Sequence, residues 1–181
     1  MKRRHLILFP AAGALAGCAA LLGPQSYTVD ETELARLLAR QFPRTQAIVG
    51  GLAELTLSSP ELRLLPDRNK LGASFDVGAS ERLSGRATRG RLDLESALRY
   101  EPSDQSLRLA QVRVQQLQWD GAGSEAAQRA AALLAERLLD NMALYRLKPE
   151  QSERLARTGL VPGPVTVTPR GVELAFVPAA R

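Results

Sequence analysis

Hydrophobic residues recur along this chain at two different periods, and each change of period marks a change in predicted secondary structure. Residues 30–42 follow helical spacing, with Asp30 placed as an N-cap, Glu33 three positions later and Pro43 just after the end. Acidic residues at such a start are typical of helix capping, and we favour that interpretation over a metal site. The apolar positions of this predicted helix are Leu34, Leu37, Leu38 and Phe42.

Between residues 51 and 119 the apolar period becomes two, which is typical of strands with one buried face. The alternating runs cover residues 53–64, 71–80, 91–100 and 107–119, with polar turns between them. The apolar phase shifts at Pro60, which predicts a β-bulge. Strands of about 12–14 residues exceed the usual 5–6, so the pattern favours a long, strongly bent antiparallel meander.

The apolar face of that sheet needs a cover, and the segment after Ser124 predicts a helix of about 20 residues, or 30 Å. Arg129, Glu136, Arg137 and Asp140 are expected to face water. The expected buried stripe is Ala127, Ala130 or Ala131, Leu134, Leu138 and Met142.

A short helix at 148–158 and a hairpin of 165–167 with 172–176 complete the predicted elements. The fold class that follows is α+β: a long helix packed against a strongly curved antiparallel β-sheet, as a single domain.

The N-terminus has a different character, because a basic start, Lys2-Arg3-Arg4, precedes a short apolar run, Leu6–Ala16. That arrangement is typical of a secretory signal peptide and is too short to span a bilayer. Leu15-Ala16-Gly17-Cys18 resembles a bacterial lipobox, in which the cysteine becomes a diacylglyceryl cysteine at the new N-terminus. The alternative is an ordinary signal peptide followed by an incidental buried cysteine. We therefore expect a signal at 1–17, a lipidated tether at 18–25 and one domain at 26–181.

Cleavage after residue 17 changes the charge of the chain. Removing Lys2, Arg3 and Arg4 from the 24 basic residues leaves 21 against 19 acidic ones, a net charge of +2 instead of +5. A nucleic-acid partner is not expected for an exported protein with so small an excess. Ala19 stands where Asp would be the usual inner-membrane retention signal, so the expected location is the periplasmic face of the outer membrane of a Gram-negative bacterium.

Few residues remain that could carry catalysis. The one histidine, His5, leaves with the signal, and the one cysteine would be alkylated, which excludes Ser-His-Asp and Cys-His chemistry. Asp and Glu are scattered, without the spacing of a metal loop. We expect no enzyme, no metal and no cofactor.

The order of motifs resembles the YceB-like family of bacterial envelope lipoproteins. The matching segments are Ser26-Tyr27-Thr28-Val29 with Glu33-Leu34, Gly51-Leu52, Leu98-Arg99-Tyr100 with Leu107-Arg108-Leu109, Tyr145-Arg146-Leu147, and Gly171-Val172-Glu173-Leu174. This family is similar in fold to the tubular lipid-binding superfamily, in which a curved sheet wraps a long helix around an apolar groove. The resemblance implies binding of a lipid or another acyl-bearing ligand.

The inner faces of the predicted strands and helix would line such a groove, and aliphatic walls suit an acyl chain. The same alternation is equally typical of a closed, packed core, and both interpretations stay open at this stage. The groove candidates are Leu55, Leu57, Phe75, Val77, Leu92, Leu94, Val112, Val114, Leu134, Leu138 and Leu174.

The competing hypothesis is a non-enzymatic envelope module with a closed core that binds a protein partner. Its surface would be an arginine-rich strand face, which could equally contact anionic lipid headgroups or simply face water. The arginines concerned are Arg82, Arg86, Arg89, Arg91 and Arg99.

The lipobox predicts that Cys18 carries acyl chains. Metabolic labelling with a palmitate analogue is expected to mark the protein, and Cys18→Ala is expected to abolish both the label and sedimentation with membranes. Labelled protein that persists in the Cys18→Ala variant would contradict the assignment.

Overall fold

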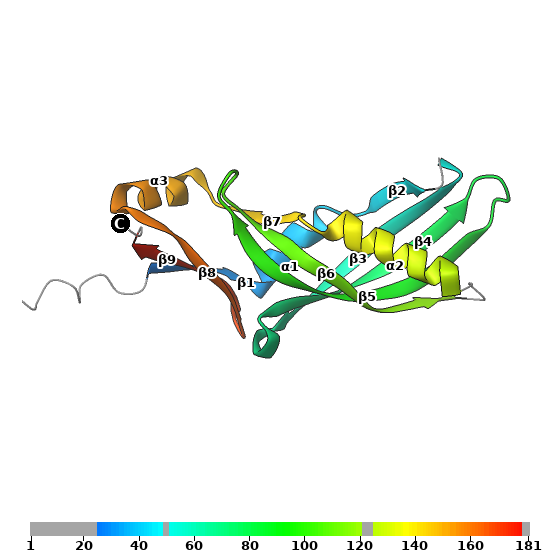
Figure 1. Ribbon diagram of the computed structural model, residues 1–181, viewed down its shortest axis with the longest axis horizontal. Helices are drawn as coiled ribbons and strands as arrows, with labels where there is room; N and C mark the ends of the chain where they lie inside the picture. Colours follow the sequence, from blue (N-terminus) through cyan, green and yellow to red (C-terminus); the bar gives the residue numbers. More distant parts are fainter. Residues whose placement is uncertain (1–24, 49–50, 121–124, 179–181) are drawn as a thin grey trace, which may run out of the picture.

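The computed structural model describes residues 25–48, 51–120 and 125–178, which form two antiparallel sheets and three helices among these residues (Figure 1). The predicted signal, Cys18, residues 19–24 of the tether and Ser124 lie outside the described residues, whereas Gln25 begins β1. The strands are β1 (Gln25–Asp30), β2 (Arg44–Ile48), β3 (Ala53–Leu65), β4 (Lys70–Glu81), β5 (Ala87–Glu101), β6 (Ser106–Trp119), β7 (Ala143–Arg146), β8 (Leu160–Thr168) and β9 (Gly171–Pro178). The helices are α1 (Glu31–Ala39), α2 (Glu125–Leu139) and α3 (Pro149–Thr158).

The larger sheet has the order β2-β3-β4-β5-β6-β7, and its four central strands are the predicted meander. It curls strongly into a half-barrel, and the described part of the molecule is mostly β-sheet (Figure 1). The predicted strand ranges agree with β3 to β6 to within a few residues at most ends. Strands β2 and β7 were not predicted, because β2 is polar and mostly exposed at the sheet edge and β7 has only four residues.

Bulges bend the long strands. The pairing of β3 with β4 shifts between Ser58 and Glu61, where Ser59 has a φ of 49°, which confirms the bulge predicted at Pro60. The β5–β6 pairing shifts twice, and Gln111 on β6 has a φ of 52°. Beside these shifts the hydroxyl of Ser96, 1% exposed, lies 3.2 Å from both the amide nitrogen and the carbonyl oxygen of Ala110. Each bulge increases local twist, which is how strands of this length close a half-barrel.

Helix α1 fills the half of the barrel that lies nearer the smaller sheet (Figure 1). The carboxylate of Asp30 accepts a hydrogen bond from the Glu33 amide at 2.8 Å, so the predicted N-cap is confirmed. Leu34 and Leu38 are fully buried against the sheet. After the helix, the ring of Phe42 packs on Phe75 of β4, with ring centroids 4.9 Å apart.

The smaller sheet, of order β1-β9-β8, contains the predicted C-terminal hairpin and lies at one end of the molecule (Figure 1). Asn69, in the turn between β3 and β4, accepts a hydrogen bond from the Val167 amide at 2.7 Å and donates one to the Val165 carbonyl at 3.2 Å. The Tyr145 hydroxyl of β7 donates to the side-chain oxygen of Gln151 at 2.9 Å and shares a hydrogen bond with the Tyr27 hydroxyl of β1 at 3.1 Å. These contacts hold the two sheets together.

Gly171, at the start of β9, lies where β1 and β9 approach most closely. A Cβ atom added there would lie 2.1 Å from the Val29 carbonyl oxygen. We expect Gly171→Ala to lower the free energy of unfolding by about 2 kcal/mol or more, as for other enforced backbone clashes. Chemical denaturation should show this loss, whereas Gly78→Ala in β4, with no atom within 4 Å of the new methyl, should change stability little. Equal effects of the two substitutions would contradict this explanation.

Candidate functional site

Helix α2 lies along the open side of the half-barrel, attached at strand β6 (Figure 1). It has 15 residues, so it is shorter than the predicted 20. The Glu136 carboxylate accepts a hydrogen bond from the Val114 amide at 2.9 Å and lies 3.5 Å from the Arg113 guanidinium. The prediction that Glu136 faces water is therefore wrong, because this side chain is 19% exposed and ties the helix to the β6 backbone.

The apolar surface of α2 consists of two adjacent stripes. The buried stripe is Ala131, Ala135 and Leu139. About 100° around the helix lies a second stripe, and its residues are half-buried or exposed. The members of this second stripe are Ala127, Ala130, Leu134 and Leu138. The predicted core stripe is confirmed at Ala131 and Met142, which are buried, and Leu134 and Leu138 are half-buried and pack against the core. It is wrong at Ala127 and Ala130, which are exposed.

The second stripe forms one wall of a cleft, which we call the α2 cleft, and strands β2 to β6 with the β4–β5 turn form the rest of its lining. It consists of two compartments with volumes of about 470 Å³ and 510 Å³ that share Ile48, Ala130 and Leu134. The first compartment is lined by Ile48, Ala53, Leu55, Ala79, Ser80, Glu81, Arg86, Thr88, Trp119, Ala127, Ala130, Ala131 and Leu134. The second is lined by Gln46, Ala47, Ile48, Ala130, Leu134, Arg137 and Leu138.

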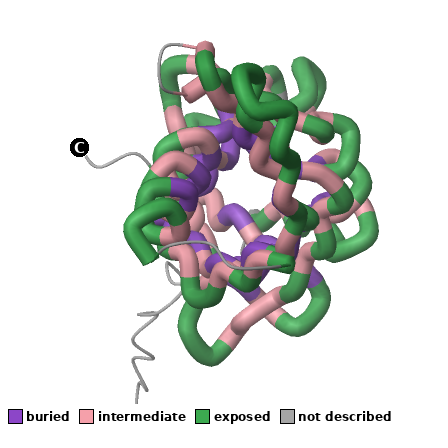
Figure 2. The backbone as a smooth tube through the Cα atoms, turned by 90° about the vertical axis from the view of Figure 1, so that its right-hand side faces the viewer, coloured by how far each residue is buried: buried purple, intermediate pink, exposed green. Residues whose placement is uncertain are grey.

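Figure 2 views the molecule from the end at which the β4–β5 turn lies, with buried segments toward the centre and exposed segments around them. Packing differs along the barrel. Beside Leu38 of α1 lies a void of about 10 Å³, whereas the half beside α2 holds the two larger compartments. The same alternating strands therefore build a packed core in one half and a lined cleft in the other.

The predicted groove residues divide between these two environments. Leu55, Leu134 and Leu138 line the α2 cleft, whereas Phe75 and Leu94 line the small void. Val114 packs against the core. Four further candidates are buried in the core: Leu57, Val77, Leu92 and Val112. Leu174 is buried in β9, which Figure 1 shows at the end of the molecule away from α2.

Several cleft residues were missed because they are small or lie at strand ends. Ala53 and Ala79 continue the inner-face alternation of β3 and β4, and Trp119 ends that of β6. The predicted alternating runs already contain all three, so taking every inner-face residue of each run as a groove candidate would have found them. Ile48 could not be found in this way, since β2 has no clear alternation.

The inner face of the sheet has charged residues at its edge, next to the β4–β5 turn. Glu81 continues the inner positions of β4, and its amide donates to the Arg86 carbonyl at 2.9 Å, so the two residues are opposite each other across the β4–β5 turn. The Ser84 hydroxyl donates to the Glu81 carboxylate at 2.7 Å. Among the described residues, no carboxylate lies within 4.0 Å of the Arg86 guanidinium.

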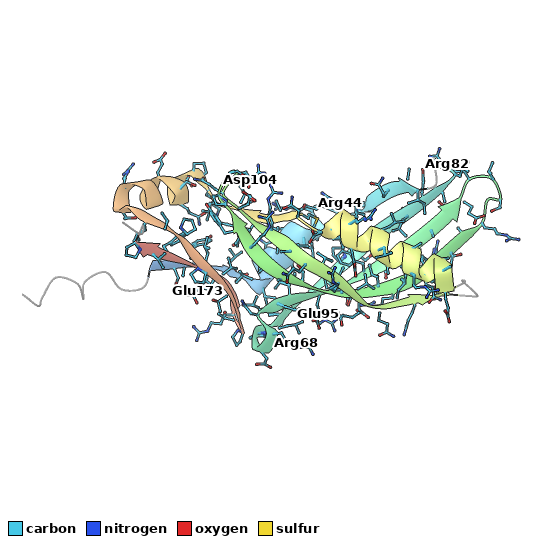
Figure 3. All side chains as sticks on the ribbon, viewed as in Figure 1. Arg44, Arg68, Arg82, Glu95, Asp104 and Glu173 are labelled. Carbon is cyan, nitrogen blue, oxygen red and sulfur yellow. The ribbon has the colours of Figure 1, made fainter. Side chains whose placement is uncertain are left out.

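The outer face of the sheet is crossed by ion pairs instead. Figure 3 shows Arg68 and Glu95, which form one of them, and Arg82, which pairs with Glu54 at the far end. Arg91 pairs with Glu61 at 2.5 Å and Arg99 with Glu101 at 2.6 Å. Three of the five arginines proposed as a docking surface are therefore already neutralised: Arg82, Arg91 and Arg99.

The side chains with shifted pKa values lie outside the α2 cleft. Hydrogen bonds from Ser106 and Arg108 hold the pKa of Asp104 below its usual range, and burial raises the pKa of Tyr145. Tyr145 belongs to the inter-sheet contact described above, and Asp104 pairs with Arg108 and Arg146. Within the described ranges, no three His, Cys, Asp or Glu side chains gather as metal ligands. In the same ranges no helix is both long and apolar enough to cross a membrane.

Comparison with known proteins identified no matching family model and no matching curated protein. The function must therefore be inferred from the cleft itself.

The two stripes of α2 predict opposite responses at neighbouring leucines. Leu139 is fully buried, so Leu139→Ala is expected to cost about 2–5 kcal/mol of unfolding free energy. Leu138 lines the cleft, and Leu138→Ala is expected to cost about 1 kcal/mol or less. Urea denaturation of both variants measures the difference, and a larger loss at Leu138 would show that the stripes have been assigned in the wrong order.

Proposed function

We propose that this protein binds a lipid or another acyl-bearing apolar ligand in the α2 cleft. The observation that carries the proposal is the second apolar stripe of α2, which lines a cavity, while its two leucines also pack against the edge of the core. A helix that only closed a core would be expected to turn its exposed side to water with polar residues. Alanine and leucine on this side are better explained by an apolar occupant.

The size and chemistry of the cleft suit that occupant. Each compartment is within the roughly 300–1,000 Å³ that is usual for small-molecule sites. The shared walls are aliphatic, with Ile48, Ala130 and Leu134 in the middle and polar groups toward the ends. Burial of ten methylene groups contributes about 8 kcal/mol before the costs of association, which is enough for micromolar binding.

The remaining features of the proposal come from the sequence. A lipidated Cys18 would anchor the protein in the outer membrane on its periplasmic side, close to a supply of lipid. The resemblance to YceB-like lipoproteins, and through them to the tubular lipid-binding superfamily, is supported to the extent that the larger sheet is antiparallel and strongly curled. The protein is proposed to act without catalysis, metal or cofactor.

Trp119 offers a direct test, since it is the one tryptophan of the chain and lines the first compartment. The full chain with Cys18→Ser, freed of bound lipid by a hydrophobic resin, is expected to bind stearate with a blue shift of tryptophan emission. Dibromostearate is expected to quench that emission, because bromine atoms on the acyl chain would lie against the indole ring. Native mass spectra before the resin step should show co-purified lipid.

A space-filling substitution shows whether the cleft is responsible. Ala130→Phe puts an aromatic ring between the two compartments, and we expect it to weaken stearate binding about tenfold or more by occupying the volume that the chain needs. Leu133→Phe is the control, since Leu133 lies on the same helix, is 60% exposed and does not line the cleft. Equal binding by both variants, or no binding of any acyl ligand by the parent protein, would refute the proposed function. Either result would favour the alternative function, a closed-core module that binds an envelope protein.

A further inference from the structure

The charges at the mouth of the α2 cleft specify the headgroup of the ligand, if the cleft binds an acyl chain as proposed above. Inner positions of β4 run at two-residue intervals from Phe75 to Ala79 and end at Glu81. On β5 the inner position Thr88 pairs with Ala79, and Arg86 is therefore the inner residue opposite Glu81. Both line the first compartment.

These two residues bear opposite charges but do not form an ion pair. Side chains directly opposite on antiparallel strands begin only about 5 Å apart, so a pair was geometrically available. Instead the Glu81 carboxylate accepts from Ser84 at 2.7 Å, and within the described residues the Arg86 guanidinium has no carboxylate within 4.0 Å. One cation and one anion thus stand side by side, with unused hydrogen-bonding capacity, where an apolar cleft meets water.

From this arrangement we infer that the ligand is an amphiphile with a zwitterionic headgroup of the phosphoethanolamine type. Arg86 is suited to the phosphate, because a guanidinium donates two parallel hydrogen bonds to phosphate oxygens. Glu81 is suited to the ammonium group, and the hydroxyls of Ser80 and Thr88 line the same compartment. A purely anionic headgroup would meet the Glu81 carboxylate, and a neutral one would leave both charges without a partner.

Three ligands that share one acylglycerol unit separate these possibilities: lauroyl monoacylglycerol, lauroyl lysophosphatidic acid and lauroyl lysophosphatidylethanolamine. Their affinities are measured by displacement of a fluorescent fatty acid from the full chain with Cys18→Ser. The parent protein is expected to bind the zwitterionic ligand about fivefold or more tightly than either of the other two.

Removing either charge is expected to weaken binding of lysophosphatidylethanolamine. For lysophosphatidic acid the two substitutions are expected to have opposite effects. Arg86→Gln and Glu81→Gln should each weaken lysophosphatidylethanolamine about fivefold. For lysophosphatidic acid, Arg86→Gln should weaken binding, whereas Glu81→Gln should strengthen it by removing a like charge. Neither should change monoacylglycerol binding, which also shows that both variants are folded.

Outer-face residues of the same two strands provide the controls. Arg89→Gln on β5 and Asp76→Asn on β4 remove the same charges from exposed positions that do not line the cleft, and they should leave all three affinities unchanged.

Equal binding of the three ligands by the parent protein would overturn the headgroup assignment and leave acyl binding intact. Weakening of lysophosphatidic acid by both substitutions would overturn it as well, because Glu81 and Arg86 would then act as an ion pair. Failure of all three ligands to bind would refute the proposed function and this inference together.

Discussion

The inner face of the curled sheet is almost wholly apolar, and the need to cover that face governs the rest of the structure. Four long strands present their inner positions to one volume, and their curvature prevents a single flat layer from covering them. Two helices share the task. Helix α1 enters one half of the barrel and packs there, whereas α2 lies along the open side of the other half. The cleft exists because α2 covers its half only in part.

The curvature of the larger sheet and the packing of the helices on its concave side depend on each other. The shifts of register near Ser59 and Gln111 bend the strands, and the bend allows α1 and α2 to contact the same sheet from its concave side. Beside Phe75, on which Phe42 packs just after α1, the remaining void is about the size of one water molecule. On α2, Ala131, Ala135 and Leu139 are buried, whereas Ala127 and Ala130 are exposed. The cleft lies along this second side of the helix.

The distribution of charge follows the same geometry. On the convex face, carboxylates and arginines of neighbouring strands reach each other across the sheet, as Arg91 and Glu61 do, and they neutralise each other. Such exposed pairs contribute little stability, but they leave few free charges on that surface. At the last inner rung, the turn between β4 and β5 brings Ser84 to Glu81 and leaves Arg86 free of carboxylates within the described residues. Glu81 and Arg86, beside the cleft, are thus among the described charges that form no ion pair.

The periodicity of the sequence was sufficient for the meander, the Asp30 cap, the Pro60 bulge and the closing hairpin. Each of these depends on neighbouring residues or on one repeated alternation, and such local preferences are visible in a chain without its fold. The ends of the larger sheet were not visible, because the polar strand β2 forms only when β3 offers it a partner. The groove candidates could not be sorted for a related reason. Leu57 and Leu55 have the same spacing and chemistry and both are buried in the core, yet only Leu55 also lines the cleft. That difference depends on how far α2 extends over the sheet and on which side it faces, and only the packing of elements distant in sequence determines both.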